Sequence, residues 1–60
     1  MKLSVFFKET KNAVHEQGYR LNELDLVDIE VKQFDCFLIN LMDRNDKEEF
    51  SLIIENPKSL

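Results

Sequence analysis

The residues best suited to catalysis in this chain are its one histidine, His15, and its one cysteine, Cys36. A cysteine nucleophile needs a base within reach, and His15 is the only histidine that could serve. No Cys-x-x-Cys or other redox spacing accompanies Cys36, and cysteine is among the residue types most often buried. We therefore interpret Cys36 as a small apolar packing residue beside Phe34 and Phe37, and we predict no catalytic residue.

Metal and cofactor sites also lack the spacing that they require. The His15-Glu16 pair starts like a zinc-hydrolase motif, but that motif needs a second histidine where this chain has Tyr19. Any metal would have to be recruited from His15, Cys36 and scattered carboxylates, which follow no recognised ligand spacing. One glycine cannot build a phosphate-binding loop. We expect no metal, no cofactor and no enzymatic activity.

The carboxylates are the remaining candidates for a binding site. The net charge is −4, but residues 1–20 hold four basic and two acidic side chains, a net of +2, whereas 21–60 hold four basic and ten acidic ones, a net of −6. The acidic part contains two groups of carboxylates, one before Lys32 and one after Met42. We predict that they form an acidic partner-binding face: Glu23, Asp25, Asp28, Glu30, Asp43, Asp46, Glu48 and Glu49.

Such a face favours some partners over others. An acidic surface repels nucleic-acid phosphates, and it attracts basic proteins and accelerates their encounter. We therefore expect a protein partner with a basic surface. The weaker alternative is a nucleic-acid binder that uses the basic residues near the N-terminus, Lys2, Lys8, Lys11 and Arg20. The carboxylates could instead only solvate the sheet and block edge-to-edge aggregation.

The elements that position these residues are expected to be mainly strands. Residues 26–32 alternate Val27, Ile29 and Val31 with charged side chains, which is the clearest period-two pattern in the chain. Other segments with strand character are 2–8, 34–42 and 50–54.

The single glycine and the single proline mark where two segments end. Residues 9–17 predict a short helix with Thr10 as its N-cap and Gly18 just past its end, and a polar loop is the alternative. Pro57 ends the last apolar run. We expect one domain over residues 1–60, in which 57–60 form a flexible tail.

The polar stretch 43–49 predicts a hairpin turn, because Asn45 and Asp46 at its centre tolerate positive φ. A turn centred there sets the register of strands 34–42 and 50–54. The expected pairs are Leu41 with Phe50, Ile39 with Leu52, Phe37 with Ile54, Asn40 with Ser51 and Asp43 with Glu48.

The stretch 27–41 is longer than an ordinary strand of about 3–10 residues. Since it has no Gly or Asn for a tight turn near 33–35, we favour one bent strand over two strands that meet there. An amphipathic helix over 23–42 is the alternative, because some of its apolar residues follow a heptad spacing. We prefer the strand, since other apolar side chains would surround such a helix and several residues are β-branched.

A chain of 60 residues and 7.1 kDa forms one domain with a marginal core. One cysteine cannot form an internal disulfide, so association with a partner is the remaining source of extra stability. Apolar residues occupy the strand face opposite Phe37, Ile39 and Leu41, and we expect this face to support a homodimer. Its predicted self-association residues are Phe34, Cys36, Leu38 and Met42.

We therefore predict a mainly β or small α+β domain with a three- to four-stranded antiparallel sheet and a C-terminal hairpin. The predicted function is that of a small acidic interaction protein that regulates or inhibits a partner protein through its acidic face. A self-assembling structural module is the alternative. No apolar run suits a membrane helix or a signal peptide, and an unpaired cysteine suits a reducing compartment, so we expect a cytoplasmic protein.

Overall fold

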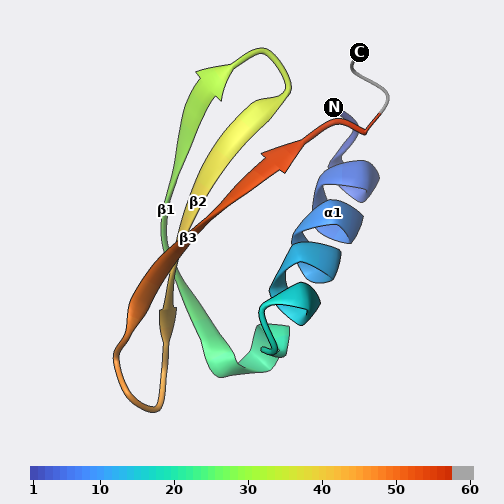
Figure 1. Ribbon diagram of the computed structural model, residues 1–60. Coiled ribbons are helices and arrows are strands. Elements are labelled where there is room, and N and C mark those ends of the chain that lie inside the picture. The colour runs from blue at the N-terminus through green and yellow to red at the C-terminus, as the bar shows by residue number, and fades with distance from the viewer. Residues whose placement is uncertain (58–60) are drawn as a thin grey trace.

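The computed structural model describes residues 1–57, which form one α-helix followed by a three-stranded sheet (Figure 1). Helix α1 spans Leu3–Glu16, and a short 3-10 helix, η1, spans Leu21–Glu23. The strands are β1 (Leu24–Gln33), β2 (Cys36–Asp43) and β3 (Glu49–Glu55). The sheet is antiparallel with the order β1-β2-β3. These elements confirm the predicted small α+β fold with its C-terminal hairpin. Apart from Pro57, the predicted tail lies outside the described residues.

Helix α1 begins earlier than the sequence pattern predicted. Residues 2–8 do not form a strand, because Leu3 and the residues after it belong to the helix. The alternation of Leu3, Val5 and Phe7 fits a strand, but Leu3, Phe7 and Val14 also recur at the spacing of one helix face. Joined to residues 9–16, they make an amphipathic helix long enough to pack on a sheet.

The two predicted ends of this helix have different outcomes. Thr10 does not cap the helix; it lies inside it, where its hydroxyl donates to the carbonyl oxygen of Phe6 at 2.8 Å. Gly18 confirms its expected role, since it follows the C-cap residue Gln17 with a φ of 86°. That conformation is accessible to glycine at little steric cost.

The β2–β3 hairpin confirms the predicted register. Leu41 pairs with Phe50, and the paired residues beyond them follow as expected: Ile39 with Leu52, Phe37 with Ile54, and Asn40 with Ser51. At the turn, the Asp43 amide donates to the Glu48 carbonyl oxygen at 2.8 Å, and the Asp43 carboxylate accepts a hydrogen bond from the Asn45 amide at 2.8 Å. The positive φ falls on Lys47, at 64°.

The stretch 27–41 is two strands rather than the predicted single bent strand, and it does not form the alternative helix over 23–42. Gln33 pairs with Cys36, so Phe34 and Asp35 make a two-residue turn. Asp35 provides the positive φ, 54°, of this turn, for which the sequence prediction considered only Gly or Asn. Asn56 supports this turn with two hydrogen bonds. Its backbone N–H donates to the Asp35 carbonyl oxygen at 3.2 Å, and its side-chain amide donates to the Asp35 carboxylate at 3.0 Å.

A bulge in β1 also escapes the sequence pattern. Leu26 pairs with Leu41 and Asp28 with Asn40, so Val27 is an extra residue between them. Even-numbered residues such as Leu26 therefore face α1 before the bulge, and odd-numbered ones from Ile29 to Val31 face it afterwards. A second register shift, between Val31 and Gln33, returns Gln33 to the side away from α1, opposite Cys36.

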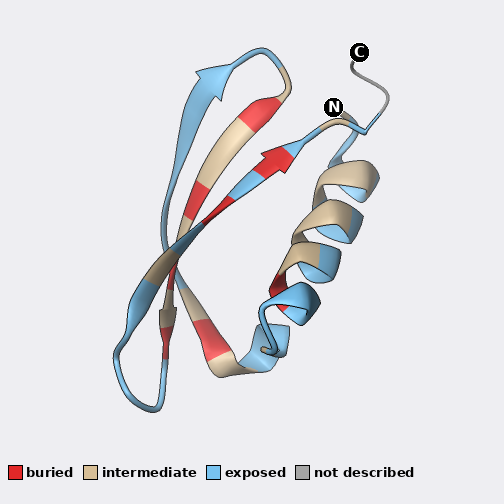
Figure 2. Cartoon of the chain, viewed as in Figure 1, coloured by how far each residue is buried: buried red, intermediate tan, exposed pale blue. Residues whose placement is uncertain are grey.

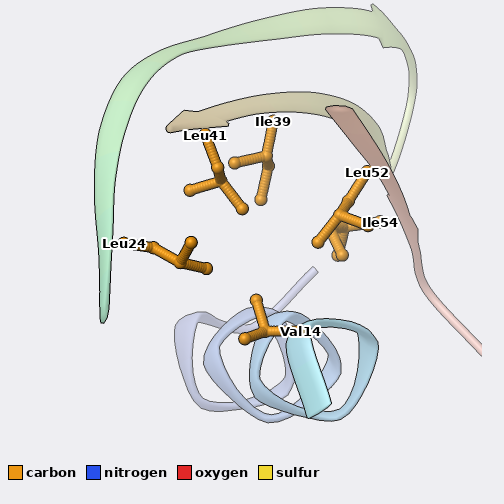
Figure 3. Packing of buried hydrophobic residues seen from close by; sticks show 6 residues of the cluster. All are labelled: Val14, Leu24, Ile39, Leu41, Leu52 and Ile54. Atoms are coloured by element: carbon orange, nitrogen blue, oxygen red, sulfur yellow. The ribbon is translucent and has the colours of Figure 1, made fainter. Parts of the chain in front are cut away.

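The core lies between α1 and one side of the sheet, which we call the inner face (Figures 2 and 3). Its buried side chains come from the helix and all three strands, and they are Val14, Leu24, Ile39, Leu41, Leu52 and Ile54. The helix packs mainly against β3, and Phe6 extends this contact to β2 by meeting Phe37 edge-on at 5.4 Å between ring centroids. The other side of the sheet, the outer face, has no element of residues 1–57 packed on it (Figure 1).

Candidate functional site

Strand register places four cross-strand rows of side chains on the outer face. Side chains alternate between the two faces of a sheet, and Ile39 and Leu41 point toward the helix (Figure 3). Their neighbours on β2, and the residues paired with those neighbours, therefore face outward. The rows are Asp25–Met42–Glu49, Asp28–Asn40–Ser51, Glu30–Leu38–Ile53 and Gln33–Cys36–Glu55.

The outer face has an apolar centre between acidic edges. Leu38 and Met42 on the central strand are partly buried, and Ile53 beside Leu38 is 52% exposed. Carboxylates occupy both edge strands and are Asp25, Asp28 and Glu30 on β1 and Glu49 and Glu55 on β3. An apolar centre with a polar rim is the usual composition of a protein–protein interface.

A hydrogen-bonded row crosses the middle of this face. The Asn40 side-chain amide donates to the carboxylate of Asp28 and, at 3.5 Å, to Oε2 of Glu30. The Ser51 hydroxyl in turn donates to the amide oxygen of Asn40. These bonds restrict the Asp28 side chain before any partner arrives, which lowers the entropy lost on binding.

One corner of the outer face is partly neutralised. Arg44 makes an ion pair with Asp25 at 3.1 Å and also donates to the Leu24 carbonyl oxygen at 3.3 Å. Both partners of the ion pair are about half exposed, so it contributes at most about 1 kcal/mol to stability. Within residues 1–57, no Lys or Arg pairs with the other four carboxylates of this face.

The remaining predicted acidic residues gather at the β2–β3 turn instead. Asp43 is 7% exposed, and its carboxylate binds the turn backbone, which leaves little of it for a partner. Glu23 accepts a hydrogen bond from the Arg20 amide at 3.0 Å in η1. Asp46 and Glu48 are exposed at the turn. The predicted acidic face is thus two separate sets of carboxylates, of which only Asp25, Asp28, Glu30 and Glu49 share the outer face.

The acidic turn surrounds the one tyrosine of the chain. The Tyr19 ring stacks on Phe50 with 5.0 Å between centroids and closes this end of the core. Desolvation raises the pKa of its hydroxyl above the usual value, and a set of nearby negative charges raises that pKa further: Asp43, Asp46, Glu48 and Glu23.

The predicted self-association residues also separate. Leu38 and Met42 lie on the outer face with the carboxylates, whereas Phe34 is 87% exposed at the β1–β2 turn. Cys36 is buried, with a free thiol. His15 lies in the last turn of α1. Cys36 lies near the other end of the helix, because its neighbour Asp35 contacts the Met1 amino group. His15 and Cys36 therefore do not meet.

Sequence reasoning missed two parts of the exposed surface. Ile53 and Glu55 join the outer face, and the predicted register already implied this, because they alternate with core residues of β3. The exposed apolar side chains of β1 on the inner face, such as Leu26 at 58%, gave no signal, because a local pattern does not say which strands a helix covers.

No three His, Cys, Asp or Glu side chains of residues 1–57 are grouped closely enough to hold a metal ion. In the same residues, no helix is long and apolar enough to cross a membrane. In comparisons with known proteins, no family model, no curated protein and no solved structure matches this chain. Its function is therefore inferred from the geometry of its surfaces.

Proposed function

We propose that this chain is a non-enzymatic interaction protein whose outer face binds a partner protein with a basic surface. The observation that carries the proposal is the arrangement of Leu38, Met42 and Ile53 between carboxylates on both edge strands. A chain bound to a partner's basic surface prevents other molecules from using that surface. This is how a small regulator or inhibitor acts.

The two parts of the outer face have different roles in this proposal. The apolar centre supplies binding energy, because burying apolar surface contributes about 25 cal/mol per Å². The carboxylate rim supplies attraction at a distance and raises the association rate with a positively charged partner. Asp28, already held by Asn40, presents its charge in a defined position.

The charge of the rim favours a basic protein over a second copy of this chain. A symmetric dimer through the outer face would oppose the same carboxylates on both copies, and like charges facing each other are unfavourable. The apolar centre nevertheless favours self-association, so a homodimer through Leu38, Met42 and Ile53 is the second candidate. High salt would promote this dimer by screening the rim, whereas it would weaken binding to a basic partner.

The proposal is tested by affinity capture from the lysate of the native host, with quantitative mass spectrometry. The bait is the wild-type chain, the outer-face variant Asp28→Lys/Glu30→Lys, or the control Glu9→Lys/Glu16→Lys. The control makes the same charge change on α1. We expect the outer-face variant to lose a basic protein that the wild type and the control retain. Equal capture by all three baits, or equal loss from both variants, would contradict the proposal.

A further inference from the structure

A second exposed apolar surface lies on the inner face, beside the helix. Helix α1 packs mainly against β3, so beyond the buried Leu24 no element of residues 1–57 covers the inner side of β1 (Figure 1). A hollow of about 470 Å³ lies between them, and its walls include Phe6, Phe7, Leu26 and Ile29. A second hollow of about 280 Å³ shares Phe6 and Ile29 and continues to Leu3. We call the two together the inner groove.

The side chains of the inner groove are unusually exposed for their type. Leu3, Phe7 and Leu26 are 68%, 60% and 58% exposed, and Ile29 is 43% exposed. Single exposed apolar residues are common, but a contiguous group on a small domain marks an interaction site. Covering this group would bury several large side chains at once.

The inner groove is long and wide enough to hold a second helix beside α1. It follows α1, whose 14 residues span about 21 Å at roughly 1.5 Å per residue. Since β1 lies two strand spacings of about 4.8 Å from β3, its distance from β3 is roughly 9.6 Å. Helices packed side by side are about 8–10 Å apart. With α1 over β3, the sheet has space for a second helix over β1.

The charge at the inner groove is positive. Lys11 and Thr10 are the only polar residues among those that line the larger hollow, and Lys11 is exposed. The acidic residues of α1, Glu9 and Glu16, line a different hollow on the β3 side of the helix. A carboxylate is therefore the group that the rim of the inner groove would attract.

A second copy of this chain does not fit the inner groove well. The Val14 side of its α1 is already buried on its own sheet, and much of the exposed remainder of that helix is polar, with Lys8, Asn12 and His15 all exposed. A symmetric contact at this rim would also bring two copies of Lys11 together. Both arguments favour a different protein.

We propose that the inner groove binds an amphipathic helix of a partner protein. The apolar side of that helix packs on Leu26, Ile29 and Phe7, and an acidic residue on its flank pairs with Lys11. This is the helix-in-groove mode of recognition, in which apolar side chains spaced by three, four and seven residues fill the groove. The site is distinct from the outer face, so either can bind without the other.

The experiment is a selection from a displayed library of helical peptides of about 18 residues, a length that spans about 27 Å. The library has apolar residues at helical spacing and random flanking residues. The targets are the wild type, Leu26→Glu, Lys11→Glu and the control Ile53→Glu. Leu26 and Ile53 are comparably exposed on opposite faces of the two edge strands. Thermal unfolding of each variant verifies its fold, and Lys11 is an exposed helix residue whose substitution leaves the core intact.

We expect peptides with acidic flanks to be enriched on the wild type. Their affinity should fall about tenfold or more in Leu26→Glu and stay within about twofold in Ile53→Glu. Lys11→Glu should shift the selected flanks from acidic to basic residues. The proposal is wrong if no peptide is enriched, if Ile53→Glu weakens binding as much as Leu26→Glu, or if the flanks do not respond to Lys11→Glu. A site for a lipid carboxylate would instead appear as laurate binding that Leu26→Glu abolishes while no peptide is enriched.

Discussion

Asn40 on β2 lies directly opposite Asp28 on β1 and donates a side-chain hydrogen bond to its carboxylate. The same amide reaches Glu30 at 3.5 Å. One neutral side chain on the central strand thereby holds two carboxylates of the outer face side by side. Asn40 thus supports the fold and orders the acidic edge that we propose for binding.

Replacing Asn40 with aspartate should destabilise the protein at neutral pH. The variant Asn40→Asp loses the donor to Asp28 and adds a negative charge beside two others, which should lower the free energy of unfolding by about 1 kcal/mol. Added salt screens these charges, so the difference from wild type should shrink in high salt. Urea unfolding at low and high salt measures this. Ser51→Ala, which removes the other bond to Asn40 without adding charge, should show no such salt dependence, and an equal deficit of Asn40→Asp at both salt concentrations would show that charge repulsion is not the cause.

Two isoleucines on opposite faces form a matched pair for testing which face the helix covers. Ile39 is 2% exposed on the inner face, and Ile53 is 52% exposed on the outer face. Ile39→Ala should cost about 2–5 kcal/mol of unfolding free energy through the cavity that it leaves. Ile53→Ala should cost less than about 1 kcal/mol, because surface substitutions have small effects. Denaturant unfolding compares the two, and similar losses would show that α1 does not cover the inner face.

Asp35 should make part of the stability dependent on pH. Hydrogen bonds from the Met1 amino group and then from Asn56 lower the pKa of its carboxyl below the ordinary value. Because the folded pKa is the lower one, ionised Asp35 stabilises the fold above its ordinary pKa of about 4 and loses this effect as the pH falls toward the folded pKa.

The variant Asp35→Asn isolates this contribution, because asparagine also tolerates the φ of 54° at this turn. We expect wild type to be more stable than Asp35→Asn near neutral pH and the difference to fall below about pH 4. Unfolding free energies measured across this range test the prediction. A difference that stays constant with pH would show that the carboxylate charge does not stabilise the turn.

The state of association should depend on salt. Carboxylates on the rim of the outer face oppose a symmetric contact through Leu38 and Met42, so we expect more self-association as salt screens them. Light scattering of the wild type over a range of salt concentrations measures this, with Met42→Glu as the variant that should remain monomeric. Self-association that weakens with added salt, or that Met42→Glu does not affect, would place the contact elsewhere.

The sequence determined the second hairpin well because two of its signals agree. Apolar residues alternate on both strands, and Asn45 with Asp46 lies between them, so only one register puts Leu41 opposite Phe50. The same strand pattern at Leu3 and Phe7 was misleading, because those spacings also fit one face of a helix. The turn at Asp35 was missed because only Gly or Asn was considered for a tight turn near 33–35, although aspartate also adopts a positive φ.

The outer face could be predicted only in part. Period-two alternation places Asp28 and Glu30 together, and the predicted register adds Asn40 beside Ser51. The sequence could not show that the face with Leu38, Met42 and these carboxylates stays exposed as one surface. That depends on which side of the sheet α1 covers, and both sides of β2 are apolar. Helix position is a tertiary property that no single segment encodes.

A map of methyl chemical shifts when the captured basic partner binds tests the role of the outer face most directly. We expect the methyl signals of Leu38, Met42 and Ile53 to shift or broaden, while those of the core residues Ile39 and Leu52 change little. These changes should vanish in Asp28→Lys/Glu30→Lys. Changes confined to Leu26 and Ile29 in the inner groove, with the outer-face methyl signals unmoved, would contradict the proposed role of the outer face.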